Sequence, residues 1–108
     1  MRSKQDVIRR ALEKLGVPHP ASARDAELVS RVYEPVLDDL ASRDKYVYGD
    51  PDAIDDDASE HVAFLLGFAV QADFGKTIPE QERLMAEARL VELNGYVLSG
   101  QALRAEYF

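Results

Sequence analysis

The segment from residue 55 to residue 73 constrains the fold more than any other, because apolar side chains occupy nearly every face of the helix it predicts. It opens with three aspartates, and its body has the sequence VAFLLGFAV from residue 62 to residue 70. A helix that is apolar all round is stable only where other elements cover it. The chain is therefore expected to fold around this helix, or to bury part of it against another subunit.

A helix is predicted over residues 3–15, where apolar residues recur at the spacing of one helix face. Ser3 is the expected N-cap, with Asp6 three residues later completing a capping box. Gly16 follows the last apolar residue and is the expected left-handed stop.

A longer amphipathic helix is predicted over residues 22–43. Ser22 and Asp25 form its capping signal. Pro35 lies inside the pattern, where it removes one backbone hydrogen bond and crowds the preceding turn, so a kink or two abutting helices are expected.

A fourth helix is predicted from Thr77 to about Leu93, with Thr77 and Glu80 as a capping box and Asn94-Gly95 as its end. Its apolar stripe is expected to face the core, and its charged residues, Glu87 among them, to face solvent. The residues of the expected core stripe are Leu84, Ala88 and Val91.

These patterns predict an all-α fold, a small four-helix bundle with an extended C-terminal docking tail. Residues 1–93 form the expected bundle domain and residues 94–108 the expected tail. At most one short extended piece is expected, near residues 46–48. The tail is rich in apolar and aromatic residues and needs a surface to bury them.

Composition narrows the class of protein further. The 108 residues include no Cys and carry a net charge of −7, with a net of −6 in residues 55–108. No apolar run is long enough to span a bilayer, so a single soluble domain that stays where it is made is expected, without a membrane. The acidic net charge argues against a protein that binds nucleic acid tightly, because affinity for the phosphate backbone comes from Lys and Arg.

No catalytic, metal or cofactor site is predicted. The acidic stretch that starts at Asp50 fails the calcium-loop template, since Asp55 stands where glycine is required and His61 where a glutamate is. The aspartates before residue 58 are instead expected to cap a helix. The two histidines, His19 and His61, belong to no metal-binding pattern. The chain is therefore expected not to be an enzyme.

Two sets of residues are predicted to contact other chains. Leu66 and Val70 are expected on a stripe of the central helix that faces a neighbouring subunit. Tyr107 and Phe108 are expected to anchor the tail in a partner, with Arg104 and Glu106 fixing the register. The full docking set is Tyr96, Leu103, Arg104, Glu106, Tyr107 and Phe108.

Several motifs, taken in order, resemble the small head-to-tail adaptor proteins of tailed bacteriophages, also called connector or head-completion proteins. They are the sequences ALEKLGV at residues 11–17, YGDPDAI at residues 48–54, FG at residues 74–75 and LRAEYF at residues 103–108. Relatives often have Pro where this chain has Asp55, a departure at the start of the predicted third helix.

The resemblance implies a structural protein of the virion neck, assembled in the host cytoplasm. Such proteins form a ring, commonly a dodecamer, that binds the portal protein and receives the next neck or tail protein. DNA passes through the channel without specific binding, and an acidic wall suits this passage. The C-terminal segment of the family commonly reaches toward the portal.

Two other classes of protein remain open from the residues alone. One is a small acidic helical regulator that binds a protein partner, antitoxin-like or anti-repressor, and is a monomer or dimer. The other is a hydrolase that uses two convergent carboxylates, which requires a cleft and a pair of acids with separated pKa values.

Overall fold

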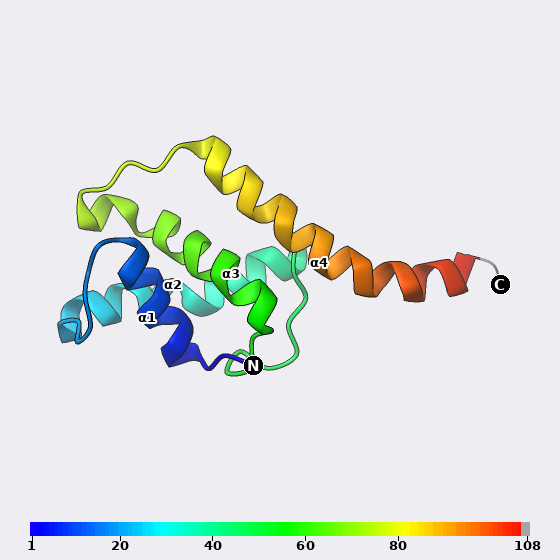
Figure 1. Ribbon diagram of the computed structural model, residues 1–108, viewed down its shortest axis with the longest axis horizontal. Coiled ribbons are helices and arrows are strands. Elements are labelled where there is room, and N and C mark those ends of the chain that lie inside the picture. Colours follow the sequence, from blue (N-terminus) through cyan, green and yellow to red (C-terminus); the bar gives the residue numbers. More distant parts are fainter. Residues whose placement is uncertain (107–108) are drawn as a thin grey trace.

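The computed structural model describes the backbone of residues 1–106 and the side chains of residues 1–93, and this part of the chain is all-helical without a named strand (Figure 1). The predicted all-α class is therefore confirmed. Its elements are α1 (Lys4–Lys14), α2 (Ala23–Ser42), α3 (Asp56–Ala69), the 3₁₀ helix η1 (Gln71–Phe74) and α4 (Glu80–Glu106).

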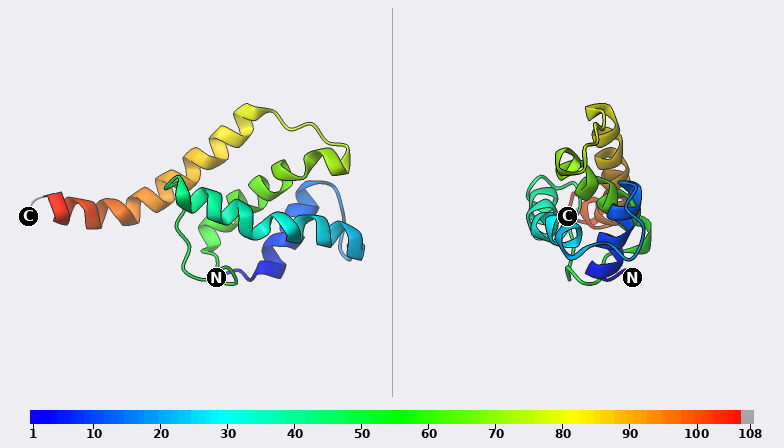
Figure 2. Two further views of the ribbon diagram at one scale, coloured as in Figure 1. Left: turned by 180° about the vertical axis from the view of Figure 1, so that it is seen from behind. Right: turned by 90° about the vertical axis from the view of Figure 1, so that its left-hand side faces the viewer.

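Helix α3 lies at the centre of the bundle, with α1, α2 and α4 packed against it (Figures 1 and 2). Its buried residues come from several of its faces, as an all-round apolar helix requires. The prediction that the chain folds around this segment is confirmed. The core contains Val7 and Leu12 from α1, Tyr33 and Leu37 from α2, Val62 and Leu66 from α3, and Leu90 from α4.

The expectation that Leu66 and Val70 face a neighbouring subunit is wrong. Leu66 is fully buried and Val70 is 3% exposed, both within this chain's own core. The surrounding helices cover both positions, so these two residues offer no surface to a second chain.

The boundary signals of α1 and α2 act as the sequence predicts. Ser3 Oγ accepts a hydrogen bond from the Asp6 amide, and the Asp6 carboxylate accepts one from the Ser3 amide, which completes the capping box. Ser22 Oγ accepts from the Asp25 amide at 3.1 Å. Gly16 has φ of +83°, the left-handed geometry that a non-glycine residue adopts only with strain.

Helix α2 is a single helix that includes Pro35. Tyr33 of this helix binds the segment of residues 43–55 that connects α2 to α3. Its Oη donates a hydrogen bond to the carbonyl of Pro51 at 2.5 Å. Burial raises the pKa of this phenol to about 12. The predicted extended piece near residues 46–48 forms no strand. Isolated bridges instead join Arg2 to Ile54 and Asp50 to Ala53.

Both predicted ends of α4 are wrong. The helix begins at Glu80, three residues after Thr77, and the intervening segment is held by Ile78, whose amide donates to Gln71 Oε1 at 2.5 Å. The helix also continues through Asn94-Gly95 to Glu106, so residues 94–106 are not an extended tail. Within the described part of the chain, no helix is both long enough and apolar enough to cross a bilayer.

Replacing Ser3 with Ala is expected to lower the free energy of unfolding by about 1 kcal/mol, because it removes the N-cap bond of α1. Thr77→Ala is the matched control, since α4 does not start there and little change is expected. Urea unfolding followed by circular dichroism measures both. Equal losses in the two variants would contradict the observed start of α4.

Candidate functional site

The outer face of α4 is the candidate functional site. Leu84 is 53% exposed, Val91 is 37% exposed, and Ala88 between them is also exposed. These three residues, called here the outer stripe, share one helix face at spacings of four and three. The sequence places this stripe in the core, and the structure places it in solvent, so that prediction is wrong.

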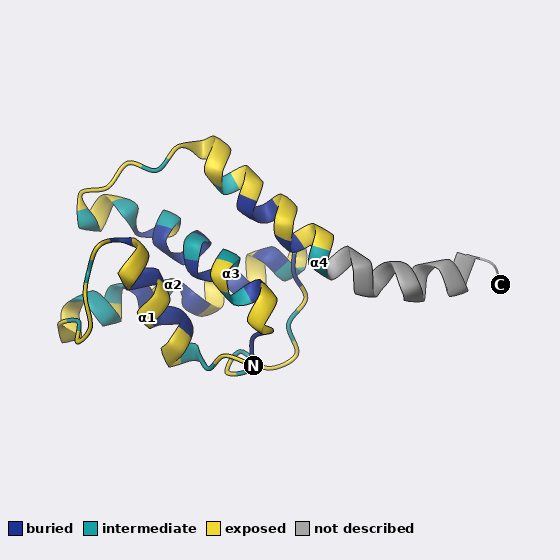
Figure 3. Ribbon diagram, in the orientation of Figure 1, coloured by how far each residue is buried: buried dark blue, intermediate teal, exposed yellow. Residues whose placement is uncertain are grey.

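The face of α4 that packs on the bundle contains the buried residues Ala86, Glu87 and Leu90. Figure 3 shows that α4 carries both buried and exposed segments along its described part. Glu87 is 6% exposed, although its charge predicts a solvent-facing position. A buried carboxylate is stable only with charged hydrogen-bond partners. The arrangement of those partners explains the rotation of α4.

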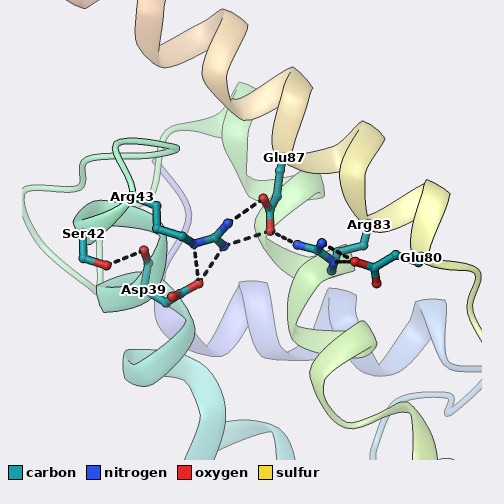
Figure 4. A network of polar contacts seen from close by, with 6 residues as sticks. All are labelled: Asp39, Ser42, Arg43, Glu80, Arg83 and Glu87. Atoms are coloured by element: carbon teal, nitrogen blue, oxygen red, sulfur yellow. Dashed lines mark hydrogen bonds and ion pairs between the residues drawn. The ribbon is translucent and has the colours of Figure 1, made fainter.

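Two arginines hold the Glu87 carboxylate (Figure 4). Arg43, at the end of α2, donates from Nη1 and Nη2 to its two oxygens at 3.0 and 2.9 Å. Arg83, one turn earlier on α4, donates from Nη1 at 2.5 Å. Each arginine also binds a more exposed acid, Arg43 binding Asp39 and Arg83 binding Glu80. These five residues are called here the Glu87 network.

The Glu87 network is charged at neutral pH. The hydrogen bond from Arg43 lowers the pKa of Glu87 below its ordinary value, although burial acts against it. The hydrogen bond to Glu87 raises the pKa of Arg43 in turn. Because the network joins α2 to the inner face of α4, it keeps the outer stripe turned away from the core.

A shallow groove of about 330 Å³ lies beside the outer stripe, on the side of α1 and α3. Phe64 and Ala86 form its apolar wall together with Met85, which is 59% exposed. Burial and then the charges of Arg89 and Lys14 lower the pKa of His61, so this rim residue is neutral near pH 7. The groove is thus mainly an apolar contact surface. Its charged or polar rim consists of Lys14, Glu60, His61, Glu82 and Arg89.

The acidic residues at the start of α3 serve the helix and the amino terminus. Asp56 and Asp57 lie in the first turn of α3, where carboxylates are favoured by the helix dipole. The amino group of Met1 binds Asp56 at 3.0 Å and lowers the pKa of that carboxyl. Among the residues whose side chains are described, no three His, Asp or Glu residues gather as a metal site requires.

For the predicted docking residues, the structure describes the backbone up to residue 106 and none of the side chains. The backbone of Tyr96, Leu103, Arg104 and Glu106 belongs to α4, while their side chains lie outside the described residues. Tyr107 and Phe108 lie wholly outside them.

The sequence pattern identifies the residues of the outer stripe but assigns them to the core. A local pattern cannot show which face of α4 the Glu87 network turns toward the bundle.

Comparisons with known proteins give no relative: no family model matches the chain, and no curated protein or solved structure matches it either. A functional assignment therefore has to come from the sequence motifs and from the surface just described.

Proposed function

We propose that this chain is a structural adaptor of the head-to-tail connector type, which forms a ring below a phage portal and extends the DNA channel. In this role it performs no chemistry. It holds neighbouring proteins together through apolar surfaces and lets DNA pass.

The observation that carries the proposal is the character of α4. Its first turns bear the exposed Leu84 and Val91, and the same helix runs into a C-terminal segment rich in apolar and aromatic residues. Fully burying a side chain of this kind contributes roughly 1.5–3 kcal/mol, and Leu84 and Val91 leave part of that free energy ungained in the free chain. Such a helix suits a protein whose working state is an assembly.

The C-terminal residues supply the proposed portal contact. Tyr107 and Phe108 are the anchors, Arg104 and Glu106 set the register, and Tyr96 and Leu103 add apolar area. Aromatic residues dominate the binding energy of protein interfaces, which is why the two terminal aromatics are assigned the largest share.

The charge of the chain supports a channel role. A net charge of −7 gives the assembled ring an acidic character that repels the DNA backbone weakly. Packaging and ejection require that DNA slides, and tight phosphate contacts from Lys and Arg oppose sliding.

A small acidic regulator that binds one protein partner is the second candidate. The groove formed by Phe64, Met85 and Ala86 favours it, because an apolar groove of this kind accepts a partner helix or loop. A regulator binds its partner as a monomer or dimer, whereas an adaptor gathers many copies on one portal ring.

Deleting residues 103–108 is expected to abolish co-purification with the portal protein of the same virus while leaving the bundle folded. Affinity capture on a tagged portal measures binding, and thermal melting by circular dichroism measures folding. Ala23→Glu in the full-length chain, an exposed change at the start of α2 away from α4, is the control with an intact C-terminus and should still bind the portal. A truncated chain that still binds the portal would place the contact elsewhere, and one that unfolds would make the segment part of the core.

A further inference from the structure

A groove and a projecting apolar side chain lie next to each other on the side of the bundle where α3 and α4 meet. The groove, of about 330 Å³, has Phe64 of α3 and the buried Ala86 of α4 in its wall. Met85 stands at its edge, and with 59% exposure it is the most exposed large apolar side chain in the described part of α4. A surface that carries both a groove and a side chain able to fill it can be complementary to a second copy of itself.

Opposite charges lie at the two ends of the same face. Glu82 and Arg89 both line the groove, about one turn on either side of Met85, so the three side chains share one helix face. The Glu82 carboxylate is exposed and forms no ion pair within the described part of the chain. Arg89 is 65% exposed; its Nη1 binds Glu92 at 3.1 Å, and its other N–H groups have no partner among the described residues. The face is therefore acidic at one end, apolar in the middle and basic at the other end.

We infer that this face binds a second copy of this chain, with the two α4 helices antiparallel. The face is called here the groove face and consists of Phe64, Glu82, Met85, Ala86 and Arg89. A two-fold axis passing between Met85 and Ala86 sets Glu82 of each copy opposite Arg89 of the other, which gives two identical pairs of opposite charge. The same axis brings Met85 of each copy to the groove of the other, against Phe64. A parallel pair would instead set Glu82 against Glu82 and Arg89 against Arg89, so the charges select the antiparallel arrangement.

Apolar contact supplies the affinity of this pair, and the charges supply its direction. Covering the exposed part of Met85 removes apolar surface from water, and a thioether against the Phe64 ring is a favourable contact. Exposed ion pairs contribute little to affinity, but like charges at both ends of the face would oppose association. This matters because each copy carries a net charge of −7. The pairing concerns the free protein and does not depend on the proposed adaptor role.

Sedimentation velocity of the full chain over a range of concentrations tests the pairing. The wild-type protein is expected to reach twice the chain mass of 12.1 kDa as the concentration rises. Met85→Glu puts a charge in the middle of the groove face and should raise the dissociation constant at least about tenfold. Because Met85 is exposed, the helical circular dichroism signal of this variant should equal that of the wild type. Ala23→Glu, at the exposed start of α2, is the control and should leave the dimer intact.

A charge exchange between the two copies tests the register and the direction of the helices. Glu82→Arg and Arg89→Glu each set like charges opposite each other in both pairs, so each variant alone should dimerise about tenfold more weakly than the wild type. Mixed in equal amounts, the two variants restore opposite charges in both pairs, and a heterodimer is expected to form. Glu34→Arg, at an exposed position of α2, makes the same change in net charge as Glu82→Arg and should leave the dimer intact.

Three results would overturn the inference. The first is a wild-type chain that stays monomeric over the whole concentration range, which would leave the groove to a different protein. The second is a dimer that survives Met85→Glu or is lost equally in Ala23→Glu. The third is a mixture of the two charge variants that associates no better than either variant alone, because the copies then do not meet with Glu82 opposite Arg89.

Discussion

Replacing Leu66 with Asp is expected to unfold the chain. Leu66 is fully buried on the central helix α3, which α1, α2 and α4 surround. The change removes a core side chain, which costs about 2–5 kcal/mol in comparable cases, and adds an unpaired carboxylate in an apolar interior. Because small domains are stable by only about 5–15 kcal/mol, the sum approaches the whole stability. Circular dichroism at 25 °C should show a large loss of helix.

The same substitution on the outer stripe is the matched control. Leu84→Asp replaces a residue that is 53% exposed, so the bundle should remain folded with nearly the wild-type helical signal. If Leu66→Asp stayed folded and lost only its ability to associate, position 66 would face a partner after all, and the packing of α3 described above would be wrong.

Glu87→Gln is expected to lower the free energy of unfolding by about 2 kcal/mol at pH 7. Glutamine keeps the shape of the side chain but removes the charge that binds Arg43 and Arg83, and buried charge-assisted hydrogen bonds are worth more than neutral ones. Urea unfolding measures the loss. Glu82→Gln, an exposed position on the same helix, is the control and should change the stability little.

The pH dependence of this difference follows from the sign of the pKa shift. The pKa of Glu87 is lowered on folding, so its charged form stabilises the fold above the unfolded pKa, about 4.3. That stabilisation is lost as the pH falls through the lower folded pKa. The gap between wild type and Glu87→Gln should therefore shrink below about pH 4. A gap of equal size at pH 7 and pH 3 would mean that the charge of Glu87 is not its source.

Local signals in the sequence were sufficient for much of the fold. The capping box at Ser3 and the glycine stop at Gly16 depend on residues within one turn of each other, so they act the same way in any context. The central position of α3 could be predicted because a helix whose body is apolar on nearly every side is stable only where other helices cover it.

The face of α4 could not be predicted, because it depends on a residue far away in the sequence. Two apolar sets compete along α4, the outer stripe and the set Ala86, Leu90 and Leu93. Arg43 at the end of α2 needs a carboxylate, and Glu87 supplies it beside the second set. The local hints were the i, i+4 pair of Arg83 and Glu87 and the helical spacing of Ala86, Leu90 and Leu93. The predicted extended tail is wrong because α4 continues through Asn94-Gly95, so this stop signal did not end the helix.

Electron microscopy of portal rings mixed with the full-length chain tests the adaptor role most directly. The expected result is added density below the portal, made of many copies of the chain arranged around the DNA channel, with C-terminal residues against the portal. Portal rings without added density, at concentrations of the chain well above those of the portal, would contradict the adaptor role and leave the small acidic regulator as the better assignment.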